Sequence, residues 1–384
     1  MALTPPWCLV CGDLGAVDVL LNVALFVPLG VGLRMAGWPL LRAAATAFAV
    51  SAAVELVQSA IPGRDPTLSD IVTNSVGGAL GAALAGWSAH LVTPVPHTAR
   101  LLAAGWATLW LAQTAATAAL IQPALPRSWY WGQLAPDLPQ FEQFTGRVDS
   151  ATAGPRRIRI GRLGRSADVR NALLAGEDLR ATTTPGGATA GLAPIVSLFD
   201  GQQREIALLG RWGDDLVYRL RTRSFDFRLR PPGIRLPNAF HAADTLVQVT
   251  GRFDPSAGTF AASLGGTQVR IERIVPLDAQ WGWSLLLPFP YAHGIESTWL
   301  TALWVFGWMV MLGYWAMAYR PAALAGAGLV LVLGLGAVPR LWELPPATMI
   351  DGLAGFGGLA VGAMVAARWH RATSGNVRGL PTSS

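Results

Sequence analysis

The chain contains no lysine, so all 29 of its basic side chains other than histidine are arginines. Charged residues make up only 14% of the 384 residues, whereas 52% are hydrophobic. This composition has too little charge for a soluble globular protein of this size, which excludes that class. The net charge of +6 comes without a basic and aromatic binding motif, so the sequence predicts no nucleic-acid partner.

Potential metal ligands are also scarce. The two cysteines, Cys8 and Cys11, form one Cys-x-x-Cys pair, and no second pair or histidine cluster is present to complete a metal shell. The five histidines are scattered along the chain. We therefore expect no metal and no cofactor, and we favour no special chemistry for the cysteine pair over a redox or zinc role.

Long apolar runs, in contrast, are abundant. Each has about the length that a helix needs to cross a bilayer. They cover about residues 17–33, 38–61, 67–91, 100–120, 298–319, 322–338 and 348–368. The sequence predicts an α-helical polytopic membrane bundle of about seven spans, four in a first domain (1–121) and three in a C-terminal domain (297–369), followed by a disordered tail (370–384).

Residues 122–296 lie between the two helical parts and differ in character. Short segments of alternating or nearly alternating hydrophobicity are separated there by Gly, Pro, Asp and Asn. They are IRIGRL, APIVSLFD, REIALLG, DLVYRLRTR, DFRLRP, TLVQVTGRFD, GTFAASLGG and TQVRIERI. About eight strands at this spacing predict an inserted all-β sandwich of the jelly-roll kind.

The arginines of the short loops predict the orientation. With seven spans, Arg64 and Arg340 lie in outward loops, whereas seven other arginines fall on one side, which the positive-inside rule makes cytoplasmic. They are Arg34, Arg42, Arg100, Arg320, Arg368, Arg371 and Arg378. The rule then places the β-domain and the turn that contains Arg64 on the extracytoplasmic side, and the C-terminus in the cytoplasm.

Residues 55–81 carry polar groups between two apolar segments. Polar side chains at membrane depth are costly, so they indicate function first. The set comprises Glu55, Gln58, Arg64, Asp65, Asp70 and Asn74. Thr67 and Asp70 have the spacing of a capping box, and Asp70, Asn74, Gly77 and Gly81 recur on one helix face.

The same pattern returns near the C-terminus. Thr348, Asp351, Gly358 and Gly362 repeat the spacing of Thr67, Asp70, Gly77 and Gly81. This repeat predicts a duplicated three-helix unit. In the second copy, the positions of Glu55, Arg64 and Asn74 are occupied by Gly336, Pro345 and Gly355, so we expect the second copy to be scaffold.

Three stretches, LNVALFVPLG, SAAVELVQ and GRDPTLSDIVTNSVGGALG, together resemble the VanZ-like family of bacterial membrane proteins. The matching positions are Asn22, Phe26, Pro28, Gly30, Glu55, Gln58, Arg64, Asp70, Asn74 and Gly77. The resemblance covers about residues 15–90. Family members often have a further helix before the one with the asparagine, and here about sixteen residues precede it. The β-region resembles the concanavalin A-like, laminin-G-type domain that some VanZ-like proteins carry, through its strand rhythm and the segments VSLFDG and RLRTR.

Three functional interpretations stay open. In the first, Glu55 and Asp70 form a catalytic carboxylate pair. Arg64, Gln58, Asn74 and Asn22 then bind an anionic membrane lipid of the undecaprenyl-phosphate type or a peptidoglycan precursor. The resemblance implies a cell-envelope context linked to resistance to glycopeptide antibiotics. In the second, Glu55 pairs with Arg64 and the polar set only ties helix ends together. In the third, the β-sandwich recognises a glycan or a protein, and the helices anchor it.

Overall fold

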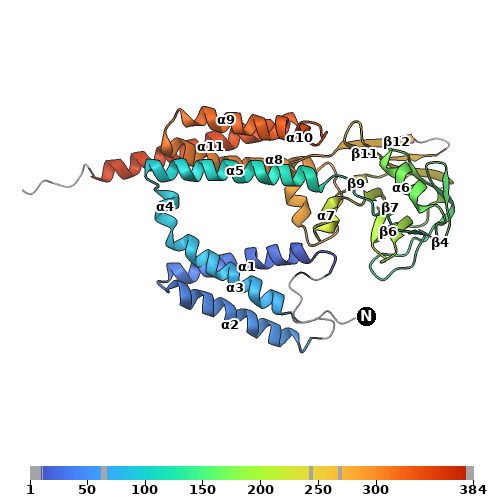
Figure 1. The fold of residues 1–384 in the computed structure, drawn as a ribbon, viewed down its shortest axis with the longest axis horizontal. Helices are drawn as coiled ribbons and strands as arrows, with labels where there is room; N and C mark the ends of the chain where they lie inside the picture. Colours follow the sequence, from blue (N-terminus) through green and yellow to red (C-terminus); the bar gives the residue numbers. More distant parts are fainter. Residues whose placement is uncertain (1–9, 11, 62–66, 242–244, 267–269, 378–384) are drawn as a thin grey trace, which may run out of the picture.

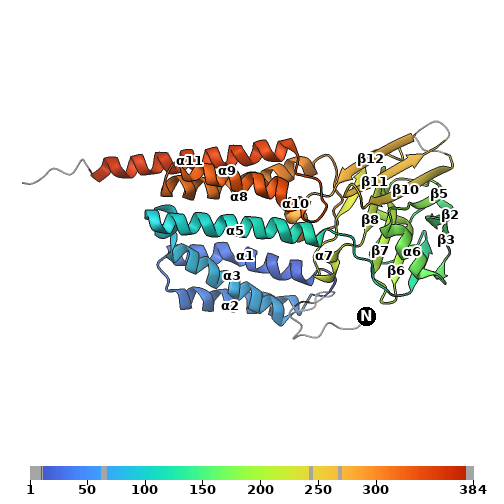
Figure 2. The same cartoon turned by 45° about the horizontal axis from the view of Figure 1, so that its top comes forward.

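The computed structural model describes residues 10, 12–61, 67–241, 245–266 and 270–377. Long helices run side by side, and a β-domain lies at one end of them (Figures 1 and 2). Cys8, Cys11 and Arg64 lie outside the described residues. The predictions that rest on these three side chains are therefore untested.

The helices form two groups along the chain. The first comprises α1 (Gly15–Met35), α2 (Leu40–Gln58), α3 (Leu68–Gly86), α4 (Ser88–Val92) and α5 (Pro96–Leu120). The second comprises α8 (Ser297–Tyr319), α9 (Ala323–Val332), the π-helical η2 (Leu333–Ala337), α10 (Val338–Arg340) and α11 (Met349–Val377).

Five helical segments of the described chain are long and apolar enough to cross a membrane. They are α1, α2, α8, the continuous stretch Ala323–Arg340, and α11 up to Ala372. Helices α3 and α5 have 19 and 25 residues and run beside these segments, but they are less apolar (Figure 2). The membrane class is confirmed, and the count of seven spans stays a prediction.

Helix α3 packs against α1 through two glycines. A Cβ atom at Gly77 would lie 2.2 Å from the carbonyl oxygen of Val23, and one at Gly81 would lie 2.1 Å from that of Val27. No side chain fits at such distances, so the two backbones touch. Small residues four apart produce this close contact between helices in lipid.

Helices α8 and α11 repeat this packing. A Cβ atom at Gly358 would lie 2.5 Å from the carbonyl oxygen of Phe306, and one at Gly362 would lie 2.0 Å from that of Val310. The glycines that the sequence places at matching positions thus make matching contacts. This agreement supports the predicted duplication, which stays a prediction.

The β-domain consists of two six-stranded antiparallel sheets, in the orders β4-β1-β6-β7-β8-β9 and β12-β11-β10-β5-β2-β3. The first sheet contains β1 (Tyr130–Leu134), β4 (Gly161–Arg162), β6 (Thr189–Asp200), β7 (Glu205–Gly213), β8 (Asp215–Leu220) and β9 (Gly233–Leu236). The second contains β2 (Arg147–Ala153), β3 (Arg156–Ile158), β5 (Leu179–Thr184), β10 (Val247–Asp254), β11 (Thr259–Gly265) and β12 (Arg270–Pro276). The helix α6 (Ser166–Leu174) belongs to the same domain. The structure describes twelve strands, whereas the sequence predicted about eight. The prediction of an antiparallel β-sandwich is confirmed, and the jelly-roll topology stays a prediction.

The core of the β-domain lies between the two sheets. Tyr218 and Phe260, which come from opposite sheets, are fully buried there and meet edge to face, with ring centroids 5.7 Å apart. Edge-to-face pairs of this kind add to the energy of burial. The sandwich therefore has a substantial core of its own, which the end of α5 joins through Ala118.

The segment DFRLRP, predicted as a strand, is not one. Its first residue ends the short helix α7 (Arg223–Asp226), and Arg228 has a positive φ of 56°. The buried guanidinium of Arg221 donates to the Asp226 carboxylate at 2.6 Å and stacks over the Phe225 ring. These contacts hold the segment in a turn despite its alternating pattern.

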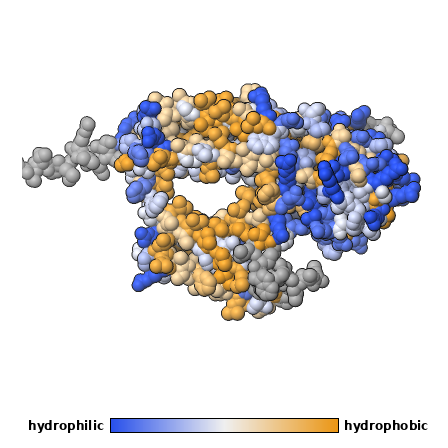
Figure 3. All heavy atoms as spheres, viewed as in Figure 1, coloured by the Kyte–Doolittle hydropathy of each residue, from blue (hydrophilic) through white to orange (hydrophobic). Residues whose placement is uncertain are grey.

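Helices α1–α3 contact the C-terminal helices through α4, at the end far from the β-domain. The indole of Trp315 donates to the carbonyl oxygen of Leu91 at 2.9 Å, and the Tyr314 hydroxyl donates to that of Val92. Between this contact and the β-domain, an opening with largely hydrophobic walls separates α1–α3 from α5 and the C-terminal helices (Figure 3). Helices α1–α3 therefore do not form one closely packed bundle with α5 and the C-terminal helices (Figure 3).

Gly81→Ala should destabilise the fold. The added methyl group has no room against Val27, so α3 must move away from α1, at a cost of about 1–3 kcal/mol. Thermal unfolding in detergent, followed by circular dichroism, measures the change. Gly32→Ala in α1 is the matched control, because no atom lies within 4 Å of its added Cβ. Equal unfolding temperatures for the two variants would contradict the close contact.

Candidate functional site

The predicted site residues that the structure describes lie on α1, α2 and α3, toward the ends of these helices that face the β-domain (Figure 1). Helix α2 ends at Gln58, and α3 begins after its cap, Thr67. The Thr67 hydroxyl accepts a hydrogen bond from the backbone N–H of Asp70 at 3.2 Å, as the capping pattern predicts. This cap positions the Asp70 side chain at the first turn of α3.

Asp70 is held by α1. The Asn22 side chain donates a hydrogen bond to Asp70 Oδ1 at 2.6 Å, and both side chains are half-buried. In lipid such a bond between helices is worth about 0.5–2 kcal/mol. The structure thus brings together two residues that are 48 positions apart in the sequence.

Asn74 is held by α2. Its side-chain nitrogen donates to the hydroxyl of Ser51 at 2.9 Å, and both residues are buried. The Ser51 hydroxyl in turn donates to the backbone carbonyl of Asp70 at 3.4 Å. Asn74 Oδ1 is buried and accepts no hydrogen bond from the described residues. An acceptor left in this state is available to a donor from a ligand.

Glu55 is the last member of the cluster and lies near the C-terminal end of α2. Its Oε2 accepts a hydrogen bond from the backbone N–H of Thr67 at 2.9 Å, and its carboxyl group also interacts with that of Asp70. Two carboxyl groups in contact can hold one proton between them, which is the basis of acid–base catalysis by such pairs. Gln58 is half-buried nearby, and no hydrogen bond joins it to Asn22, Asp70 or Asn74.

The β-domain contributes a charge that the sequence did not indicate. Arg230 donates to the backbone carbonyls of Leu287 at 2.7 Å and Pro288 at 3.0 Å, which fixes its guanidinium beside the helices. Burial and the neighbouring Arg219 lower the pKa of Arg230 to about 10, while the charge of Asp18 acts in the opposite direction. Arg230 is thus within electrostatic range of α1.

Ser51 and Asp18 were also missed. Serine in an apolar helix gives no sequence signal of its own, because it satisfies its hydroxyl within the helix as easily as across it. Asp18 did give a sequence signal, because it precedes Asn22 by four residues and therefore lies on the same face of α1.

Comparison with known families identifies the helices that carry this cluster. Residues 4–89 match the family model described as VanZ/LLP1. These residues form a VanZ-like domain. No curated protein and no solved structure matches the chain. The matched region includes every predicted site residue, whereas the concanavalin A-like assignment of the β-domain stays unconfirmed.

A second buried polar cluster lies where the β-domain meets the C-terminal helices. Asp278, only 8% exposed, follows β12, and its Oδ1 accepts a hydrogen bond from the backbone N–H of Gln280 at 2.8 Å. Burial and the charge of Asp351 raise the pKa of Asp278 to about 7. Asp351, the counterpart of Asp70, accepts from the Thr348 hydroxyl at 2.6 Å. An acidic pair therefore also lies beside the C-terminal helices, with Asp351 on α11 and Asp278 in the connection after β12.

Among the residues that the structure describes, no three His, Cys, Asp or Glu side chains come together in a way that could hold a metal ion. The polar cluster of the VanZ-like domain instead offers two carboxyl groups, an unpaired amide oxygen and a nearby guanidinium. This set suits hydrogen bonding and proton transfer.

Asp70→Asn should remove the charge of this side chain without destabilising the fold. The Asp70→Asn side chain keeps an oxygen that can accept the hydrogen bond from Asn22, so the unfolding temperature should stay nearly unchanged. Asn22→Leu removes the donor of this bond, so it should lower the free energy of unfolding by about 0.5–2 kcal/mol. Thermal unfolding in detergent tests both. Ser75→Ala is the control, because the Ser75 hydroxyl bonds only to its own helix, at Ile71. A strongly destabilised Asp70→Asn protein would show that the charge itself holds the fold.

The stability of the protein should depend on pH through Asp278. An unfolded aspartate titrates near pH 4, and Asp278 titrates at about 7 when folded, so the native state binds more protons between these values. Stability should therefore fall as the pH rises from about 4 to 7. Asp278→Asn should remove this decline and add about 2–4 kcal/mol at neutral pH and above. Unfolding scans at about pH 5 and pH 8 measure it. The exposed Asp137→Asn should keep the wild-type slope, and an unchanged slope in Asp278→Asn would refute the assignment.

Proposed function

We propose that this membrane protein of the cell envelope binds an amphiphilic lipid with an anionic, phosphate-type headgroup where the VanZ-like domain meets the β-domain. The observation that carries the proposal is a cavity of about 390 Å³ between the start of α1 and the β-domain, lined by two arginines and two aspartates. Its lining residues are Gly12, Asp13, Arg204, Phe225, Asp226 and Arg228. A guanidinium matches the geometry of phosphate oxygens, and such a volume holds a headgroup.

The turn after β8 brings further positive charge to this place. Arg228 donates to the backbone carbonyl of Val10, just before α1, and Arg230 lies within electrostatic range of Asp18. Arg223 is exposed on the same turn. Arginines at a membrane surface attract anionic headgroups. The segment DFRLRP forms a turn instead of the predicted strand, and the arginines of this turn are therefore the residues of the β-domain that contact such lipids in this proposal.

The helices offer room for the apolar part of the lipid. The opening between α1–α3 and the other helices has largely hydrophobic walls (Figure 3). A hollow of about 470 Å³ with an almost wholly apolar lining lies on α5, α8 and the connecting turn η1 (Trp281–Leu286). Its lining residues include Trp106, Trp283, Leu300, Leu303, Trp304 and Trp308. Acyl or isoprenyl chains suit these surfaces, which supports an undecaprenyl-phosphate-type lipid or a lipid-linked peptidoglycan precursor.

Within this proposal, Glu55 and Asp70 are the groups for proton transfer, if the lipid is processed as well as bound. Asn74 Oδ1 offers the free acceptor, and Arg64, Gln58 and Asn22 complete the ligand-binding set. The hydrogen bond between Asn22 and Asp70 equally serves to hold α1 against α3. A link with resistance to glycopeptide antibiotics, and an extracytoplasmic position of the β-domain, rest on the family resemblance and on the arginine pattern of the loops.

Purification in a mild detergent, followed by mass spectrometry of the bound lipids, tests the proposal. An anionic phospholipid or isoprenyl phosphate should be enriched over the bulk membrane. Arg228→Gln and Arg64→Ala should each lower the ratio of lipid to protein about tenfold, because each removes a charge-assisted hydrogen bond. Arg157→Gln, on β3 at the far side of the β-domain, is the control (Figure 2). A bound-lipid composition equal to that of the membrane, or an equal loss in the control, would rule the proposal out.

A further inference from the structure

We propose that the β-domain binds a neutral oligosaccharide in a cavity built around Trp129 and Trp131. This site is separate from the lipid site proposed above and stands independently of it. The cavity has a volume of about 400 Å³, which is enough for two or three sugar rings. It lies over β1 and the turn between β6 and β7, and residues 138–140 form one of its walls.

The two tryptophans are the first argument. Trp129 and Trp131 are 40% and 39% exposed, and their ring centroids are 6.0 Å apart. Tyr130, between them, is fully buried in the core, so the alternation of the strand turns both indoles outward into the cavity. Half-exposed indoles facing a cavity offer flat apolar surfaces, which stack against the C–H faces of sugar rings.

The polar lining is the second argument. Gln133, Gln140 and Gln203 line the cavity, and a carboxamide both donates and accepts hydrogen bonds, as a sugar hydroxyl does. Gln133 Oε1 is buried and has no partner among the described residues. A buried acceptor beside a cavity is the kind of group that a ligand hydroxyl satisfies.

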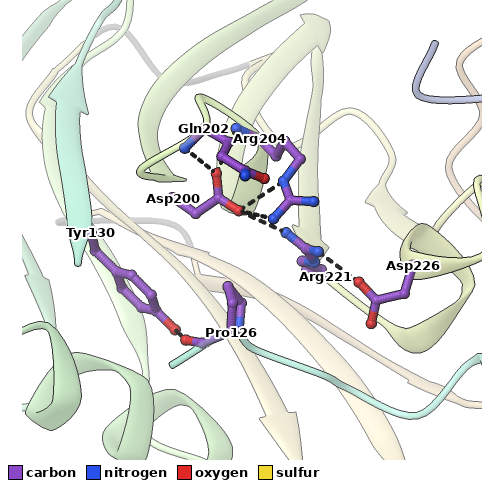
Figure 4. Close-up of polar contacts among 7 residues, drawn as sticks. All are labelled: Pro126, Tyr130, Asp200, Gln202, Arg204, Arg221 and Asp226. Atoms are coloured by element: carbon purple, nitrogen blue, oxygen red, sulfur yellow. Dashed lines mark hydrogen bonds and ion pairs between the residues drawn. The ribbon is translucent and has the colours of Figure 1, made fainter. Parts of the chain in front are cut away.

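The charges around the cavity are already paired, which points to a neutral ligand. Asp200 Oδ1 accepts from the backbone N–H groups of Gln202 at 2.9 Å and Arg204 at 3.0 Å, and its Oδ2 accepts from the side chains of Arg204 at 2.9 Å and Arg221 at 3.2 Å (Figure 4). Against the effect of burial, these bonds hold the pKa of Asp200 below its usual range. The guanidinium of Arg162 covers the ring of Trp129 at 5.4 Å.

A peptide fits this cavity less well than a sugar. Strand β1 pairs with β4 on one side, where Trp131 faces Arg162, and with β6 on the other, where Trp131 faces Phe199. Around Trp131 the backbone of β1 is therefore paired on both sides within the sheet, and it is not available to an added peptide strand. Side chains alone, chiefly indoles and carboxamides, are left to make contact.

Isothermal titration of the full chain in lipid nanodiscs with cellotetraose, chitotetraose and maltotetraose tests the site. At least one of these should bind saturably, and Trp131→Ala should weaken its binding at least about tenfold, the loss of one stacking contact. Gln140→Ala, on an exposed loop, should weaken it severalfold even if Trp131→Ala does not fold. Phe227→Ala removes an aromatic side chain that is 63% exposed in the same domain and does not line the cavity, so it should bind as the wild type does.

Three results would overturn the proposal. The first is that none of the sugars binds saturably at concentrations up to about 10 mM. An affinity weaker than this is too low for specific recognition. The second is sugar binding that Trp131→Ala and Gln140→Ala leave unchanged, or that Phe227→Ala weakens equally. The third is binding of a proline-rich peptide, sensitive to Trp131→Ala, without binding of any sugar.

Discussion

The backbone contact between α1 and α3 is the constraint on which the polar site depends. Gly77 and Gly81 bring α3 so close to α1 that no side chain fits between them. Because helix periodicity places Asp70 and Asn74 on the same face as these glycines, their side chains must also point at neighbouring helices. The cost of such polar groups in lipid is met by their bonds to Asn22 and Ser51. The same face of α3 therefore both packs against α1 and positions a cluster of reactive side chains.

These contacts bear on whether the cluster is structural or functional. Asp70 and Glu55 are satisfied by Asn22 and by the backbone of Thr67, which is what a purely structural role requires. A structural role leaves the buried Asn74 Oδ1 unexplained, since an acceptor without a donor destabilises a fold. It also does not account for the guanidinium of Arg230, which the β-domain holds near α1. The unpaired acceptor and this charge favour a ligand.

How far the sequence could predict this structure depends on how local each signal is. The helical face of Asp70, Asn74 and Gly77 and the two classes of domain follow from hydrophobic periodicity, which acts over a few residues. Arg230 could not be found in this way, because only the fold brings it to α1. DFRLRP had the right alternation for a strand, but the ion pair of Arg221 with Asp226 overrides it. The sequence also does not distinguish the half-exposed Trp129 and Trp131 from an aromatic residue such as Tyr218, which is buried in the core, because only the fold decides which face of the sheet is covered.

The two helical units differ most in what the β-domain places beside them. Beside the first unit it holds Arg230, a positive charge within range of Asp18 on α1. Beside the second it buries Asp278, and this burial, together with the charge of Asp351, raises the pKa of Asp278 to about 7. A positive charge favours an anionic ligand, whereas a second carboxyl group repels one. Two units with matching glycine contacts thus have opposite electrostatic surroundings. This difference is a physical reason to place the proposed headgroup site at the VanZ-like domain and not at its C-terminal counterpart.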